Sequence, residues 1–206
     1  MRHLPNIITI IRVPSVFVIA FFAAIEMKWG ATIAFWLFFF AAASDYVDGW
    51  LARKLGVVSN FGKLMDALTD KILSIGMMLF LLVMPPILPK YCAFLVVIIL
   101  VREFLITGLR LVAASSGVVL AAERSGKIKT VLQLLSIGIL LFVNAARADW
   151  QWTIESGDSF IGLNVEQWYG VGLGFFFAAT LLTVTSGTGY LIKYWKIFWE
   201  EPTTKS

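Results

Sequence analysis

Four aspartates lie in one short stretch of an otherwise apolar chain. Asp45 and Asp48 are three residues apart, and Asp66 and Asp70 are four residues apart. At about 100° per helical residue, each pair falls on one face of a helix. Carboxylates beside hydrocarbon need compensation, and oxygen ligands without a nearby Cys or His favour Mg²⁺ or Mn²⁺ over Zn²⁺. The spacing therefore predicts a divalent-cation site formed by two helices.

The composition predicts that these helices lie in a membrane. Hydrophobic residues make up 59% of the 206 residues and charged residues 15%, which is outside the range of soluble domains. The single cysteine, Cys92, excludes an internal disulfide, and the single histidine, His3, lies at the terminus, where it cannot easily join a metal cluster. The net charge of +4 does not indicate nucleic acid, because the basic residues flank apolar spans, where anionic lipids or phosphorylated substrates are the expected partners.

Six apolar runs are long enough to cross a bilayer, which takes about 20 helical residues. Polar, Gly-containing or Pro-containing segments separate them. We therefore expect an all-α integral membrane protein, with one domain over residues 1–206 and six transmembrane helices. The expected spans are residues 7–25, 31–50, 63–84, 91–114, 128–146 and 168–190.

The aspartates are expected at one membrane face. The second span must continue to about Trp50 to cross the bilayer, which places Asp45 and Asp48 in its last turns. Asp66 and Asp70 then lie in the first turns of the third span. Because a short connection makes consecutive helices antiparallel neighbours, both pairs reach the same face. This predicts an active site at the ends of the second and third helices.

The basic residues predict which face this is. With six spans, eleven basic residues fall on the side of the aspartates and three on the other. By the positive-inside rule, the aspartates and both termini are cytoplasmic. The eleven are Arg2, Arg53, Lys54, Lys63, Arg110, Arg124, Lys127, Lys129, Lys193, Lys196 and Lys205, and the three are Lys28, Lys90 and Arg147.

The aspartate stretch resembles the signature of the CDP-alcohol phosphatidyltransferase family. The matching positions are Asp45-x-x-Asp48-Gly49-x-x-Ala52-Arg53, eight intervening residues, and Gly62-x-x-x-Asp66-x-x-x-Asp70. Ala67 and Thr69 depart from the family, which usually has proline and often alanine there, but neither is a ligand position. The alternative is structural: the acids pair with Arg53, Lys63 and Lys71, and the small residues allow close helix packing.

This resemblance implies roles for each matching residue. Asp45, Asp48, Asp66 and Asp70 would hold two divalent ions, Mg²⁺ or Mn²⁺, on the diphosphate of a CDP-activated lipid. Asp70 would also be the general base for the acceptor hydroxyl. The CDP-lipid would be bound by Arg53 through a nucleotide phosphate, with room made by the small residues Gly49, Ala52 and Gly62.

A second set of motifs resembles the bacterial branch of the family that makes phosphatidylglycerophosphate. Arg102 and Arg110 are eight residues apart, about 80° in projection, so they can flank one cavity that Lys127 approaches from the following loop. These three would bind the acceptor's phosphate. Alternatively, Glu103 pairs with Arg102, which leaves Arg110 and Lys127 as the phosphate ligands. The motifs are Pro5–Arg12, Arg102-Glu103-Phe104, Thr107–Arg110 and Gly126–Thr130, and we find none beyond Gln133.

The resemblance implies a homodimer in the bacterial inner membrane, surrounded by membrane lipids, that transfers a phosphatidyl group from CDP-diacylglycerol to glycerol 3-phosphate. Within the family, the alternative acceptor is an inositol phosphate. Outside it, a cation transporter would use intramembrane aspartates as ion ligands, but such acids usually lie near the midplane on broken helices. A scaffold that binds anionic lipid would explain the basic loops but not the aspartates.

Overall fold

The computed structural model describes residues 4–55, 60–84, 87–115, 124–152 and 158–194. The side chains of residues 4–12, 45–55, 60–67, 70, 115, 124 and 125 lie outside this description. The described residues fold as six α-helices, so the all-α prediction is confirmed. They are α1 (Leu4–Ala24), α2 (Gly30–Leu55), α3 (Asn60–Val83), α4 (Cys92–Ser115), α5 (Arg124–Ala148) and α6 (Val165–Tyr194).

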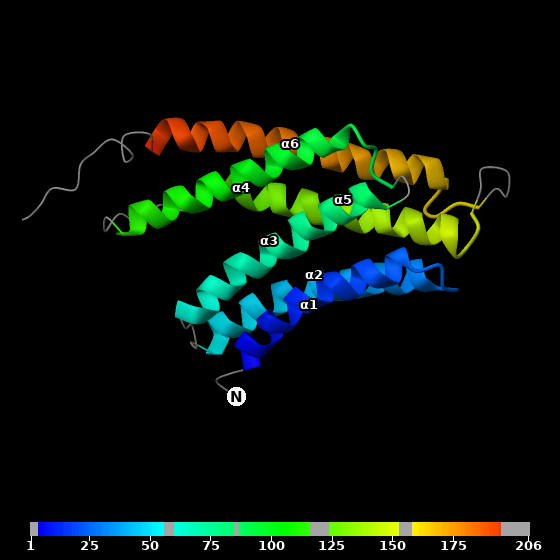
Figure 1. Cartoon of the computed structure of the whole chain (residues 1–206), viewed down its shortest axis with the longest axis horizontal. Helices are drawn as coiled ribbons and strands as arrows, with labels where there is room; N and C mark the ends of the chain where they lie inside the picture. The colour runs from blue at the N-terminus through cyan, green and yellow to red at the C-terminus, as the bar shows by residue number, and fades with distance from the viewer. Residues whose placement is uncertain (1–3, 56–59, 85–86, 116–123, 153–157, 195–206) are drawn as a thin grey trace, which may run out of the picture.

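Consecutive helices run in alternating directions along the bundle (Figure 1). The first residues of α1, α3 and α5 and the last residues of α2, α4 and α6 therefore lie at the same end, on the left of the figure. We call this the motif end, because the stretch from Asp45 to Asp70 includes the end of α2 and the beginning of α3. The helix directions thus agree with the alternation that the sequence predicts.

One apolar core joins all six helices. It contains Ile19 of α1, Phe38 of α2 and Met77 of α3, together with buried residues of the other three helices. The packing of α5 on α6 is close, because a Cβ atom on Gly172 would lie 3.0 Å from Leu140 Cδ2. Ser136 Oγ of α5 also donates a hydrogen bond of 2.9 Å to the carbonyl oxygen of Gly172. This core fixes how the helices are placed at the motif end.

The opposite end of the bundle is held by polar contacts to Asp149, just after α5. The Asp149 carboxylate accepts hydrogen bonds of 2.7 Å from both the backbone N–H and the hydroxyl of Thr32, in the first turn of α2. Such a carboxylate satisfies amide donors that a helix N-terminus leaves without intrahelical partners. The start of α2 is therefore attached to the end of α5, which limits how far α2 can slide.

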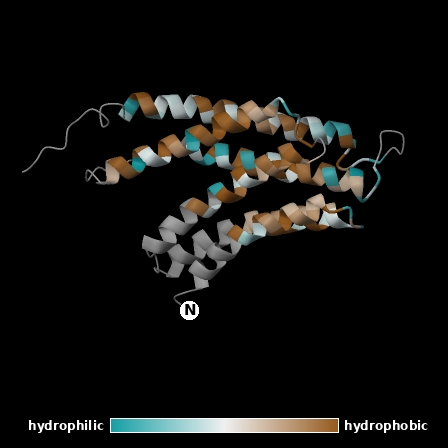
Figure 2. Cartoon of the chain, in the orientation of Figure 1, coloured by the Kyte–Doolittle hydropathy of each residue, from teal (hydrophilic) through white to brown (hydrophobic). Residues whose placement is uncertain are grey.

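The outer surface of the bundle is apolar, as a membrane-embedded surface must be. Phe17 is 71% exposed and Ile192 is 78% exposed. Figure 2 shows hydrophobic residues along α4, α5 and α6. Among the described residues, three helices are long and apolar enough to cross a membrane, namely Cys92–Ala114, Gly126–Ala148 and Val165–Tyr194. The chain thus has the features of a membrane protein, while the six-span count remains a prediction.

One expectation about a loop is wrong. The sequence predicts that Lys127 lies on the loop that follows the fourth span, whereas α5 already begins at Arg124. Lys127 therefore lies in the first turns of a helix and does not approach from a loop. The reason is physical: Arg and Lys have high helix propensity, so the helix extends beyond the apolar run from which its beginning was predicted.

Candidate active site

The backbone of α3 places Asp66 and Asp70 in line with its buried face. The same four-residue spacing continues to Ser74 and Met78, which are 5% and 1% exposed. Residues four apart lie one above the other on a helix, so the line runs from the motif end into the core. The side chains of Asp66 and Asp70 lie outside the part of the chain that the structure describes.

The register of α2 has the same consequence. Ala34 and Phe38 are buried in the core, and Asp45 follows Phe38 by seven residues, which is about two helical turns. Gly49 lies one turn further along the same line, with Asp48 beside it. In both α2 and α3, the face that is buried in the core therefore continues to the motif end, where it carries the motif's aspartates.

The connection between α2 and α3 limits the distance between these halves. Only residues 56–59 separate Leu55 from Asn60, so their Cα atoms are at most about 18 Å apart. The remaining predicted ligands of the CDP-lipid lie in the same two helices. Gly49, Ala52 and Arg53 are in α2, and Gly62 is in α3, all with side chains outside the described part of the chain.

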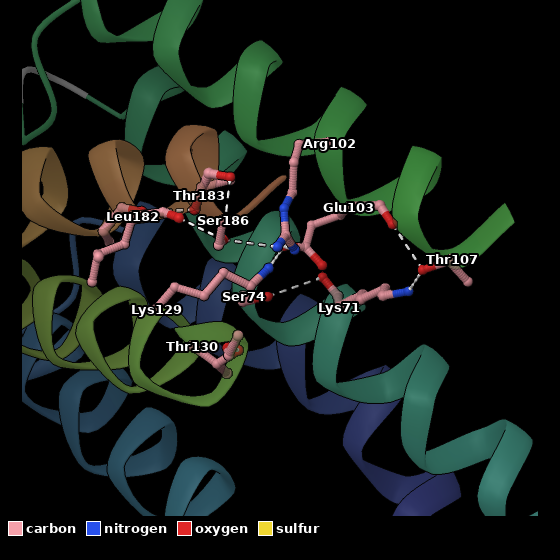
Figure 3. A network of polar contacts seen from close by, with 12 residues as sticks. Lys71, Ser74, Arg102, Glu103, Thr107, Lys129, Thr130, Leu182, Thr183 and Ser186 are labelled. Carbon is pink, nitrogen blue, oxygen red and sulfur yellow. Dashed lines mark hydrogen bonds and ion pairs between the residues drawn. The ribbon is translucent and has the colours of Figure 1, made fainter. Parts of the chain in front are cut away.

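A polar network connects α3, α4, α5 and α6 within the apolar bundle (Figure 3). At its centre is Glu103, whose carboxylate forms ion pairs with Lys129 and, at 3.3 Å, with Arg102 Nη1. The Lys129 side chain is only 5% exposed and that of Glu103 13%. The polar network consists of Lys71, Arg102, Glu103, Thr107, Lys129 and Ser186.

The network also connects the motif-bearing helix to α4. Lys71, which follows Asp70 in α3, donates a hydrogen bond to the Thr107 hydroxyl. Thr107 in turn donates to the backbone carbonyl of Glu103 at 2.7 Å, which leaves its oxygen lone pairs to accept from Lys71. The described side chains of the network include three cations, Lys71, Arg102 and Lys129, and one carboxylate, Glu103.

Of the three residues predicted to bind the acceptor's phosphate, two contact α6 and the third is exposed. Arg102 and Arg110 both lie against α6: Arg102 Nη2 is 2.9 Å from Ser186 Oγ, and Arg110 Nε is 3.3 Å from the Tyr190 hydroxyl. Lys127 is exposed on α5. The Arg102–Glu103 pair that the alternative interpretation predicts is present, but the carboxylate also binds Lys129.

Sequence reasoning missed Lys129 and the α6 partners. Lys129 lies in the same motif as Lys127, and the buried residues Gln133 and Ser136 follow it at helical spacing. That spacing was the available signal, because it identifies the inward face of the helix. Ser186 and Tyr190 carry no such signal, since every face of α6 is rich in apolar or small residues.

Comparisons with known proteins agree with the motifs. Residues 2–168 match the sequence profile described as CDP-alcohol phosphatidyltransferase. A Bacillus subtilis protein named CDP-diacylglycerol–glycerol-3-phosphate 3-phosphatidyltransferase is 40% identical over 156 residues, which are 70% of this chain and 79% of that protein. Proteins of the same name from Rickettsia typhi and Rickettsia felis are 31% and 32% identical, over 92% of this chain and 96% and 93% of theirs. The resemblance predicted from the motifs is confirmed.

Proposed function

Because this chain belongs to the CDP-alcohol phosphatidyltransferase family, we propose that it transfers the phosphatidyl group of CDP-diacylglycerol to glycerol 3-phosphate. The products are phosphatidylglycerophosphate and CMP. The relatives named for this reaction support it, and so does one structural observation: the polar network includes Lys71, which directly follows Asp70 in α3. A donor site and an acceptor site for two phosphorylated substrates would then be adjacent.

The aspartates fit a site for divalent ions. Asp45, Asp48, Asp66 and Asp70 offer only carboxylate oxygens, which are the ligands that Mg²⁺ and Mn²⁺ prefer. When bound, two such ions would stabilise the negative charge that develops on the diphosphate. The register of both helices toward the buried faces supports this assignment.

The protein's own groups would position the substrates and move one proton. Asp70 takes the proton from the acceptor hydroxyl, whose oxygen forms the new bond to the phosphorus of the phosphatidyl group. The bond from that phosphorus to the oxygen shared with CMP breaks, and this oxygen leaves with CMP. Arg53 binds a phosphate of the nucleotide, while Gly49, Ala52 and Gly62 make room for it. Arg102, Arg110 and Lys127 bind the acceptor's phosphate.

Neutralising one acceptor cation tests this proposal. Arg110→Ala and Lys127→Ala are each expected to lower kcat/KM for glycerol 3-phosphate about tenfold to a hundredfold, because each removes a charge-assisted hydrogen bond. KM for CDP-diacylglycerol should be nearly unchanged, whereas Arg53→Ala should raise it. Initial rates of CMP release, with each substrate varied in turn, give these constants.

Two controls make this test specific. Uncharged glycerol cannot use the phosphate site, so it should react poorly with every form and respond little to these substitutions. Arg147→Ala removes a cation at the opposite end of the bundle and should leave all the constants unchanged. Unchanged kinetics with glycerol 3-phosphate in both acceptor variants would contradict the assigned site.

The same assay separates the alternatives. CMP release from CDP-diacylglycerol is expected of an enzyme and of neither a cation transporter nor a lipid-binding scaffold. A panel of alcohols that includes an inositol phosphate separates the two acceptors. The homodimer remains a prediction from the resemblance.

The proposed orientation has its own test. We propose an inner-membrane protein with six spans and a cytoplasmic active site, supported by the distribution of basic residues. In a Cys92→Ser background, single cysteines at Ser59 and Ser125 should react with an impermeant thiol reagent from the cytoplasmic side, and one at Ser156 from the other side. Reaction of positions 59 and 125 from opposite sides would contradict the six-span arrangement.

A further inference from the structure

The last helix contacts both arginines of the proposed acceptor site, although the family match ends at residue 168, near the beginning of α6. Helices α4 and α6 run in the same direction (Figure 1). Arg102 therefore meets α6 at Ser186, and Arg110, further along α4, meets it at Tyr190. No motif in the sequence assigns a role to this part of α6.

Gly187 allows Arg102 to lie directly against α6. A Cβ atom at Gly187 would lie 2.7 Å from Arg102 Cγ, which is closer than Cβ atoms approach other atoms, and 3.0 Å from its Nε, which is a tight contact. Cγ is near the root of the side chain, so displacing it also moves the guanidinium. Gly187 is buried, which leaves the arginine little space to yield on the side of α6.

Ser186 and Glu103 bind the other end of the Arg102 side chain. Its Nη2 donates to Ser186 Oγ at 2.9 Å, and its Nη1 to Glu103 Oε1 at 3.3 Å. The Ser186 hydroxyl donates its own hydrogen to the backbone carbonyl of Leu182 (Figure 3). The serine oxygen is thereby oriented as an acceptor, so the guanidinium is held from both sides.

Arg110 is held one helical turn further along α6. Its Nε donates to the Tyr190 hydroxyl at 3.3 Å, and its guanidinium carbon lies 5.4 Å from the centre of the ring. Tyr190 is only 2% exposed and packs on the ring of Tyr194. A buried aromatic residue is a rigid support, and its ring face attracts a cation.

We propose that Ser186, Gly187 and Tyr190 are positioning residues that orient Arg102 and Arg110 toward the phosphate of the acceptor. This inference rests on the proposed function, since it assumes that these arginines bind the acceptor. It explains part of the affinity for the acceptor by residues of α6 that lie beyond the family match. α6 thus contributes to acceptor choice without contacting the reacting atoms.

A Gly187→Ala substitution tests the inference. Alanine normally stabilises a helix relative to glycine, so a purely local effect would be neutral or favourable. We expect instead that KM for glycerol 3-phosphate rises about tenfold, because Arg102 loses its place, with KM for CDP-diacylglycerol unchanged. The matched control is Gly189→Ala on the same helix, where an added Cβ meets nothing within 4 Å, and its kinetics should equal those of the wild type.

A double variant separates positioning from a general packing defect. In an Arg102→Ala background the added methyl group has no arginine to displace, so Gly187→Ala should cause no further rise in acceptor KM. A full additional effect in that background would overturn the inference, as would an unchanged acceptor KM in folded Gly187→Ala protein. If Gly187→Ala does not fold, Ser186→Ala and Tyr190→Phe replace it, each expected to raise acceptor KM about threefold to tenfold.

The wild-type reaction distinguishes failure of this inference from failure of the proposed function. If wild-type protein forms no lipid product from CDP-diacylglycerol and glycerol 3-phosphate, the proposed function fails and this inference fails with it. If the wild type forms product and all three α6 variants keep its acceptor KM, only the positioning role is wrong.

Discussion

An Asp66→Asn substitution is expected to lower turnover roughly a thousandfold, because it removes a charged ligand of ions that stabilise the transition state. Asparagine keeps the size of the side chain, so packing in the first turns of α3 should survive. The same loss is expected for Asp45→Asn, Asp48→Asn and Asp70→Asn. CMP release from CDP-diacylglycerol with saturating glycerol 3-phosphate measures it.

Metal dependence provides a second measurement that does not depend on turnover. Mg²⁺ or Mn²⁺ should raise the Tm of the wild type, since a ligand that binds only the folded state stabilises it. The rise should be lost in Asp66→Asn. A chelator should abolish wild-type activity, and either ion should restore it.

The control for charge removal is Asp158→Asn. Asp158 lies in the connection between α5 and α6, at the opposite end of the bundle from the aspartate motif. Its removal should change neither activity nor the response of Tm to metal. Full activity of Asp66→Asn, or of a wild-type sample verified to be free of divalent metal, would refute the metal-site assignment.

Most of the helical fold was predictable because apolar runs near 20 residues long have few alternatives in a membrane protein. The expected span over residues 63–84 corresponds to α3 (Asn60–Val83), and that over residues 91–114 to α4 (Cys92–Ser115). The ends were less predictable where polar residues continue a helix. α2 reaches Leu55 and α6 reaches Tyr194, both beyond the expected spans.

The sequence predicts only those parts of the candidate site whose residues lie close together in the chain. The aspartate motif is such a case, since helical register alone aligns Asp66 and Asp70. The partners of Arg102 and Lys129 lie on other helices, and hydrophobic periodicity cannot rank the faces of a helix that is apolar all round. The contact between Arg102 and Ser186 spans 84 residues of sequence, so only the packed structure reveals it.

Removing the carboxylate of Glu103 is expected to have the largest effect on stability. Glu103→Leu would remove the carboxylate that pairs with both Arg102 and Lys129, in a setting where these side chains are largely shielded from water. Breaking a buried ion pair by removing one partner costs about 3 to 5 kcal/mol. At about 2 to 4 °C per kcal/mol for a chain of this size, Tm should fall by at least 6 °C. Thermal unfolding in detergent, followed by circular dichroism, measures the change.

Comparison with an exposed pair shows whether burial is the cause. Glu166 forms a contact of 2.6 Å with Arg147, but the two side chains are 47% and 36% exposed. Water and salt screen such a pair, so Glu166→Leu should cost less than about 1 kcal/mol. Adding Lys129→Met to Glu103→Leu should restore part of the lost Tm, because it removes one of the two cations left without the carboxylate. Equal losses in the exposed and buried variants, or no recovery in the double variant, would mean that Glu103 acts through packing and not through its charge.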